Sequence, residues 1–437
     1  SDLLSSKDEM TKKTAKFDTN CVHGVYKAEN AQPQVIPIIQ NTTFRYYDSS
    51  DIAALFNLDS PEFFYSRLAN PTVSALEGKM ALLEGGTAGK CTSSGQAATL
   101  ITVLNLCNAG DHMISATNIY GGTHNLLGVS LKKLGIDVDF VDQELSAEEI
   151  AAHARPETKA VLGETLGNPA LSILDFKKFS KVAHMLGVPF IVDNTLATPA
   201  LCRPVEHGAD IVIEATTKYA DGHASCVGGS IVESGKFDWA ASDKFPGFTE
   251  PDESYHGLVF YDKFGETAFC TRLTAVLVRD LGCTMSPMNA YLTHQGLQTL
   301  HLRMQRHSEN AFALAKFLQQ HDMVDWVTYP GLKNDKYYDL ACKYMPDGQS
   351  GVLSFGVKGG MEAGVKFQEA LNLTSIVVHV GDVRTSVLHP ASSTHRQLTE
   401  EEQIAAGIRP ELIRASVGIE DIDNRSEERR VGKECRS

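Results

Sequence analysis

The stretch Ala209-Asp-Ile-Val-Ile-Glu-Ala-Thr-Thr-Lys218-Tyr-Ala-Asp-Gly-His223 decides the fold prediction. Its apolar residues predict a buried strand, and hydroxyls, one lysine and a glycine turn follow that strand. A lysine desolvated at such a strand end has a lowered pKa and can attack a carbonyl carbon as a Schiff-base nucleophile. Most lysines are solvated surface charges, so Lys218 alone leaves the structural and the catalytic interpretation open.

A second apolar run, Val188-Pro-Phe-Ile-Val192-Asp193-Asn194-Thr195, ends in an aspartate. Asp193 precedes Lys218 by 25 residues, which is room for one crossover between neighbouring parallel strands. Ligands of open parallel sheets bind outside the carboxyl ends of the strands, where both side chains would lie. A carboxylate beside a Schiff-base lysine indicates pyridoxal phosphate, because the ring nitrogen of that cofactor needs an acidic partner. Asp193 as the cap of a following helix is the alternative.

Short apolar strands alternate with helical patterns from Asp111 to Val232, which predicts an α/β fold with a mainly parallel sheet covered by helices. A helix around Leu302 to Leu318 and the strand Gly351 to Phe355 begin a smaller C-terminal α+β domain. We therefore expect four segments. They are a leader and extended oligomer-contact arm (1–70), a cofactor-binding α/β domain (71–285), a C-terminal domain (286–424) and a vector-derived tail (425–437).

The composition narrows the classes of partner. A net charge of −14 and a pI near 5.5 argue against nucleic-acid or anionic-membrane binding, since both require basic surface. No apolar run reaches the roughly 18 residues that span a bilayer, so we expect a cytoplasmic protein. The 9 cysteines include no CxxC pair, and neither a disulfide framework nor a metal site is predicted.

Two further stretches indicate an anion and a flat ligand. Ser94, Gly95 and Gln96 lie in a hydroxyl and glycine turn before an apolar helix, where free backbone N–H groups can bind a phosphate. Neither Walker A nor GxGxxG spacing is present, which weakens the case for a nucleotide-binding site without excluding one. Tyr120, beside two glycines, can lay its ring on a cofactor, although a packed tyrosine explains it equally well.

The segment before the first long helix carries a phenol and a guanidinium. Asn70 and Pro71 fit the N-cap and first position of that helix. Capping does not explain Tyr65 and Arg67, which together can hold a phosphate.

Six motifs, in order and spacing, resemble the Cys/Met-metabolism pyridoxal-phosphate enzymes, which include cystathionine synthases and lyases, methionine γ-lyase and O-acetylhomoserine sulfhydrylase. The motifs are Tyr65-Ser-Arg67 with Asn70-Pro-Thr, Ser94-Gly95-Gln96, Tyr120-Gly-Gly-Thr, Asp193-Asn-Thr, Thr217-Lys218-Tyr and Arg414-Ala-Ser-Val-Gly-Ile-Glu-Asp. The resemblance runs from Phe17 to Asn424. It implies the aspartate-aminotransferase-like fold (fold type I), pyridoxal 5'-phosphate as cofactor, and a homotetramer built as a dimer of dimers whose active sites are shared between subunits.

The resemblance also implies roles for residues. Lys218 would bind the cofactor covalently and move protons, Asp193 would pair with the ring nitrogen, and Tyr120 would stack on the ring. The phosphate contacts implied are Gly95, Gln96 and Thr217, with Tyr65 and Arg67 from an adjacent subunit, and Ser94 would also bind the cofactor. Asn168 would lie near the cofactor and substrate, Arg414 would bind the substrate α-carboxylate, and Thr385 and Arg384 would lie near the substrate.

Three departures from relatives carry information on the reaction. Ala215 stands where most relatives have a phosphate-binding serine, which predicts weaker cofactor binding by about 1 kcal/mol. Gly122 stands where methionine γ-lyases have a cysteine, and Arg384 stands where enzymes that make or break cystathionine have an acidic residue. Both differences argue against those activities.

An insertion from Gly235 to Gly257 and the loop from Gly381 to His395 resemble those of the O-acetylhomoserine sulfhydrylases. A surface excursion is the alternative for the insertion. The implied reaction joins O-acetyl-L-homoserine and sulfide, or a small thiol, to give homocysteine or methionine and acetate, with Tyr65 or Tyr120 assisting departure of the leaving group. Cystathionine γ-synthase, a γ-lyase and a cofactor-binding scaffold without turnover remain alternatives.

Overall fold

A seven-stranded sheet forms the centre of the computed structural model, which describes residues 15–394, 396, 399, 401, 403 and 407–423. The first 14 residues of the predicted leader, the tail from 425 and His395 of the predicted substrate loop lie outside these residues. Within them, the strand order is β1-β7-β6-β5-β4-β2-β3. The strands are β1 Ala88–Thr92, β2 His112–Ala116, β3 Asp137–Val141, β4 Thr158–Glu164, β5 Phe190–Asp193, β6 Ile211–Glu214 and β7 Gly229–Glu233.

The predicted mainly parallel α/β fold is confirmed by the strand directions. β2, β3, β4, β5 and β6 pair in parallel, whereas β7 runs antiparallel to both β6 and β1. Ile191 lies opposite Ile211, so β5 and β6 are direct neighbours joined by one crossover. Their carboxyl ends therefore meet at one edge of the sheet, with Asp193 and the turn that carries Lys218.

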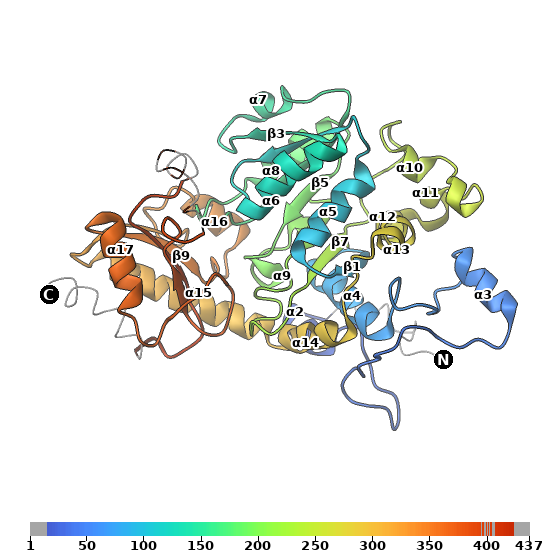
Figure 1. Ribbon diagram of the computed structural model, residues 1–437, viewed down its shortest axis with the longest axis horizontal. Helices are drawn as coiled ribbons and strands as arrows, with labels where there is room; N and C mark the ends of the chain where they lie inside the picture. Colours follow the sequence, from blue (N-terminus) through green and yellow to red (C-terminus); the bar gives the residue numbers. More distant parts are fainter. Residues whose placement is uncertain are drawn as a thin grey trace.

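A second sheet has the order β10-β11-β12-β9-β8. Its strands are β8 Val324–Thr328, β9 Val352–Val357, β10 Ser375–Ile376, β11 Ser386–Leu388 and β12 Leu412–Ser416. It has its own apolar core, in which Phe355 and Ile413 from the sheet pack with Leu314 of α15. In Figure 1 this sheet and its helices lie at one end of the molecule, while the N-terminal segment with α3 extends at the other.

Helices cover both sheets. The helices are α2 Phe17–His23, α3 Ser49–Phe56, α4 Pro71–Glu84, α5 Gly95–Leu106, α6 Gly121–Asn125, α7 Ala147–Ala151, α8 Phe176–Met185, α9 Thr198–Leu201, α10 Pro246–Thr249, α11 Phe260–Phe264, α12 Ala268–Arg272, α13 Arg279–Leu281, α14 Pro287–Gln298, α15 Leu300–Gln319, α16 Tyr338–Tyr344 and α17 Gly360–Glu369. No helix in the described part of the chain has the length and apolar character to cross a bilayer.

The N-terminal segment departs from the sequence prediction at its start. We expected an extended arm within residues 1–70, but residues Phe17–His23 form α2. The buried Cys21 joins α2 to the main core, so burial of this face stabilises a helix that the local pattern did not predict. Beyond Gly24 the chain has no regular element until α3, and many of its large apolar side chains are exposed, including Tyr47 and Phe56.

The insertion from Gly235 to Gly257 is packed against the main domain and is no surface excursion. Trp239 is 2% exposed and stacks on Phe248 at 4.2 Å and on Phe269 of α12 at 5.7 Å between ring centroids. The hydroxyl of Tyr255 donates to the carbonyl of Ala275 at 2.7 Å. The aromatic residues of the insertion thus extend the core over the helices beside β7.

Asn70 joins the N-terminal segment to α4. Its side-chain oxygen accepts from the Thr72 N–H at 3.0 Å as the N-cap, and its amide donates to the Ile39 carbonyl at 2.8 Å. We expect Asn70→Ala to lower the free energy of unfolding by about 1–2 kcal/mol, because it removes the cap and the tie to the segment. Urea denaturation at constant protein concentration measures this change.

Asn70→Asp is the matched control, since it keeps the cap acceptor but removes the donor to Ile39. It should lose less stability than Asn70→Ala. Equal losses in the two variants would show that the cap itself contributes little.

Candidate cofactor and substrate site

Lys218 lies in the turn that follows β6, at the carboxyl edge of the sheet. Its N–H donates to the Ala215 carbonyl at 3.2 Å, and its own carbonyl accepts from Gly222 at 2.8 Å. Burial, and secondly the nearby charge of Arg414, lowers the pKa of the Lys218 amine from 10.5 to about 8. The amine forms no ion pair with any described residue, so it is available as a nucleophile near neutral pH.

Thr195 connects Asp193 to the lysine turn. Its hydroxyl donates to Asp193 Oδ1 at 2.5 Å and accepts from the Ala215 N–H at 2.9 Å. The Thr195 N–H donates to the same carboxylate oxygen at 3.0 Å. These bonds fix the carboxylate and the start of the lysine turn relative to each other.

Three carboxyl groups lie close together below this edge. Burial raises the pKa of Asp193, and burial with the charge of Asp193 raises the pKa of Glu164 well above its usual range. The pKa of Glu214 is also raised, mainly by burial. No described lysine, arginine or histidine pairs with Asp193, so the site favours a cationic group from a ligand.

The N-terminus of α5 forms one wall of the site. Ser94 caps this helix, accepting from the Ala97 N–H at 3.0 Å, and the first N–H groups of the helix point outward without intrahelical partners. Gly95 lies against Ala215, where an added Cβ would come within 2.6 Å of the Ala215 methyl. Thr217, also on the lysine turn, exchanges hydrogen bonds with Gly228 through its hydroxyl at 3.1 Å each.

Tyr120 lies at the N-terminus of α6, and its side chain is half exposed. Its N–H donates to Glu164 Oε2 at 2.7 Å, so β4 fixes its backbone. A Cβ on Gly122 would come within 2.5 Å of the Tyr120 ring and 2.9 Å of Gln96 Nε2. Gln96 itself donates to the Thr123 hydroxyl at 3.3 Å. The ring, Gln96 and Gly122 therefore meet at the mouth of the site.

Arg414 comes to the site from the second sheet. It lies on β12, opposite Leu388 of β11 and Ser354 of β9, and its Nη2 donates to the Val378 carbonyl at 3.1 Å. Burial lowers its pKa to about 10, while the nearby Tyr120 raises it. Ser354 also donates to the Pro169 carbonyl at 3.2 Å, and the adjacent Asn168 Oδ1 is buried without a hydrogen-bond partner among the described residues.

Two predicted substrate residues make other contacts. The Thr385 hydroxyl donates to Glu420 at 2.9 Å and accepts from the Gly418 N–H at 2.9 Å. Arg384 pairs with Asp382 at 3.1 Å and donates to the His223 carbonyl at 2.9 Å, with its side chain mostly exposed. Both anchor the loop that carries them.

Among the described residues, no hydrogen bond or ion pair joins Tyr65 or Arg67 to Lys218. The guanidinium of Arg67 lies 5.3 Å from the centroid of the Tyr65 ring and donates to the Arg279 carbonyl. The guanidinium of Arg279 lies 5.3 Å from the ring of Tyr255 in the insertion. The pair is thus held near α13.

Sequence reasoning assigned no role to two residues of the site. Thr195 follows β5, and Glu164 ends β4. A polar side chain at the carboxyl end of an apolar strand was the sequence signal that could have identified both.

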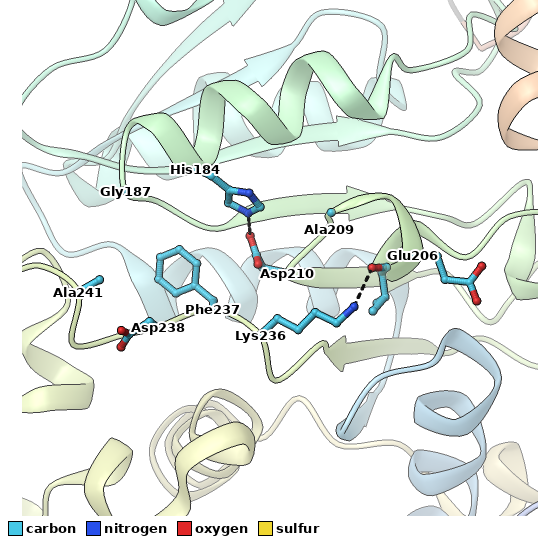
Figure 2. A pocket seen from close by; sticks show the side chains of 11 residues that line it. His184, Gly187, Glu206, Ala209, Asp210, Lys236, Phe237, Asp238 and Ala241 are labelled. Carbon is cyan, nitrogen blue, oxygen red and sulfur yellow. Dashed lines mark hydrogen bonds and ion pairs between the residues drawn. The ribbon is translucent and has the colours of Figure 1, made fainter. Parts of the chain in front are cut away.

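A groove of about 480 Å³ lies at the opposite end of the strands (Figure 2). Residues that precede β5 and β6 and follow the antiparallel β7 line it, including His184, Asp210 and Lys236. His184 pairs with Asp210 at 2.8 Å, which raises the pKa of the histidine. Because it lies at the amino ends of β5 and β6, this groove is separate from the Lys218 edge.

Comparisons with known proteins agree over nearly the whole chain. Residues 18–427 match the family model described as Cys/Met metabolism PLP-dependent enzyme. The chain belongs to this family. It is 42% identical over 432 residues to an O-acetyl-L-homoserine sulfhydrylase from Leptospira meyeri, with 97% of each chain covered. It is 44% identical over 411 residues to a homocysteine synthase from Schizosaccharomyces pombe, with 93% of this chain and 96% of that one covered.

A solved structure has the same fold. The putative O-acetylhomoserine (thiol)-lyase of Campylobacter jejuni superposes with a TM-score of 0.92 at 35% identity, covering 95% of this chain and 99% of that one. That structure carries N'-pyridoxyl-lysine-5'-monophosphate. The enzymes of this family depend on pyridoxal 5'-phosphate, and the observed features fit that cofactor. They are the lysine of lowered pKa, the open helix N-terminus and, as far as the described residues go, a carboxylate without a cation and Asn168 Oδ1 without a hydrogen-bond partner.

The lowered pKa of Lys218 predicts how cofactor attachment depends on pH. Only the unprotonated amine attacks, so the attachment rate to cofactor-free protein should rise about tenfold per pH unit below 8 and level off above it. With an ordinary lysine, the attachment rate would continue to rise up to pH 10.5. The growth of the visible band after mixing measures the rate.

Lys218→Ala is the control, and borohydride reduction followed by mass spectrometry should find no cofactor fixed to that variant. A rate that climbs steadily through pH 10, or a labelled lysine elsewhere in the variant, would contradict the assignment.

Proposed function

We propose that this protein is an O-acetylhomoserine sulfhydrylase. It would convert O-acetyl-L-homoserine and sulfide, or a small thiol, to L-homocysteine, or methionine, and acetate. The observation that carries the proposal is identity above 40% over nearly the full length to relatives named O-acetyl-L-homoserine sulfhydrylase and homocysteine synthase. We place the reaction in the cytoplasm, as expected from the sequence.

Lys218 is proposed as the residue that binds the cofactor covalently and then moves protons at Cα and Cβ of the substrate. When bound, pyridoxal 5'-phosphate supplies an electron sink for the charge that develops at Cα. The pKa of about 8 supports this role, because a free amine at neutral pH can accept a proton and return it. The bond to acetate breaks at Cγ, and sulfur bonds to the same carbon.

Asp193 is proposed to hold the ring nitrogen in its protonated form, and its hydrogen bonds from Thr195 keep the carboxylate in place. Tyr120 would stack on the ring and, with Tyr65, is a candidate to assist departure of acetate. The proposed phosphate contacts are Ser94, Gly95, Gln96 and Thr217, which lie at the α5 terminus and on the lysine turn. Ala215 offers a methyl group there, so one hydroxyl contact is absent.

Arg414 is proposed to bind the substrate α-carboxylate as a bidentate pair, and Asn168 to contact the cofactor and substrate. The half-buried guanidinium, which donates to a backbone carbonyl, supports the first role, and Asn168 Oδ1, which has no partner in the described part of the chain, supports the second. Thr385 is proposed near the substrate with its hydroxyl bonded to Glu420. Arg384 is proposed beside the substrate with its charge paired to Asp382.

A product assay tests the activity. The protein is offered O-acetyl-, O-succinyl- or O-phospho-homoserine with sulfide, cysteine or methanethiol. We expect homocysteine and acetate to form fastest from the acetyl ester with sulfide, and Lys218→Ala to form neither. Faster use of cysteine would identify a cystathionine γ-synthase, and release of ammonia and an α-keto acid would identify a γ-lyase. A cofactor band that no amino acid shifts would support a binding scaffold.

We further propose a homotetramer in which each active site receives Tyr65 and Arg67 from an adjacent subunit. The exposed apolar side chains of the N-terminal segment support the arrangement, and within the described residues no hydrogen bond or ion pair joins this pair to Lys218.

Mixing two inactive variants tests for shared sites. Neither Lys218→Ala nor the double variant Tyr65→Phe, Arg67→Ala should turn over alone. Chains refolded together in equal amounts should regain about a quarter of wild-type activity, because half of the dimers are mixed and each has one intact site. Absence of recovery, with native size on gel filtration, would contradict sharing.

A further inference from the structure

His379 lies on a segment whose backbone is fixed from two sides. Arg414 donates to the Val378 carbonyl at 3.1 Å, and the Ser386 hydroxyl donates to the His379 carbonyl at 3.5 Å. The Gly381 N–H donates to the Ser416 hydroxyl at 2.9 Å. The His379 side chain is therefore presented from a rigid segment next to Arg414.

The same segment lies against the lysine turn. A Cβ on Gly381, whose φ is +84°, would come within 3.1 Å of the Lys218 carbonyl carbon and 2.8 Å of the Tyr219 nitrogen. The charged groups that act on His379 are Lys218, Arg414, Asp382 and Asp221. They come from the lysine turn, β12 and the loop of His379 itself. His379 thus borders the space between the proposed cofactor lysine and the proposed carboxylate-binding arginine.

The Nε2 atom of His379 is buried and has no hydrogen-bond partner among the described residues. His389, ten residues further on, shows the opposite arrangement, because its two ring nitrogens contact Ser392 at 2.8 Å and the Pro410 carbonyl at 2.6 Å. A buried polar atom without a partner loses the hydrogen bond it made with water. At the edge of a ligand site, a ligand can supply that bond.

We propose that His379 contacts the substrate, its Nε2–H donating to an α-carboxylate oxygen of the amino acid that Arg414 holds. A carboxylate is the favoured partner because Lys218 and Arg414 give this space a positive potential. Burial and the charge of Lys218 lower the pKa of His379, so the ring is neutral and carries one N–H for donation. The inference rests on the proposed binding of an amino-acid substrate at Arg414, but not on which homoserine ester reacts.

The test compares His379→Gln with His379→Met in the cofactor-loaded enzyme. The two side chains are similar in size, but only glutamine has an N–H donor. We expect His379→Met to raise KM for the homoserine ester about tenfold, as loss of one hydrogen bond predicts, with kcat within about twofold. His379→Gln should keep KM within about threefold of the parent. Cofactor content and KM for sulfide should not change in either variant.

A binding measurement separates this inference from the proposed reaction. L-norleucine, an unreactive amino acid, is titrated into each loaded enzyme while the cofactor spectrum is followed. His379→Met should weaken its dissociation constant about tenfold and His379→Gln should restore it, even if no homoserine ester is turned over. His153→Met, a surface change, is the control and should match the parent.

Parental norleucine affinity in His379→Met would overturn the proposal. Equal weakening in the Met and Gln variants, or a fall in cofactor content, would also overturn it, since either result indicates a packing role.

Discussion

The site depends on one hydroxyl, that of Thr195, which donates to Asp193 and accepts from Ala215. Neighbouring parallel strands bring their carboxyl ends together, but they do not by themselves fix the side chains beyond those ends. Thr195 ties the end of β5 to the turn after β6. Thr195, rather than a direct bond between Asp193 and Lys218, therefore positions the carboxylate relative to the lysine of lowered pKa.

The second sheet supplies the part of the site that the first sheet does not. Arg414 enters from β12, and the segment from Val378 to Gly381 reaches the lysine turn so closely that only glycine fits at its contact point. The site therefore lies where two separately packed cores meet. Its positive side comes from Lys218 and Arg414, and its acidic side from Asp193, with the carboxyl of Glu164, whose pKa is raised, behind it.

The insertion and the N-terminal segment are linked through Arg279. Tyr255 of the insertion holds Arg279, whose carbonyl accepts from Arg67. The insertion, which resembles that of the O-acetylhomoserine sulfhydrylases, thereby supports Tyr65 and Arg67, the pair proposed to serve a neighbouring subunit. Trp239, stacked on Phe248 and Phe269, makes this support part of the core.

Local patterns determined the strands, the capped start of α4 at Asn70 and the placement of Asp193 and Lys218 at one edge, because periodicity and caps act between near neighbours. Motif resemblance added the family and the cofactor. Only the tertiary structure decided that Phe17–His23 is a helix, that Thr385 bonds to Glu420 and Arg384 to the His223 carbonyl, and that His379 borders the site. Each of these depends on contacts between residues far apart in the chain, which no local pattern encodes.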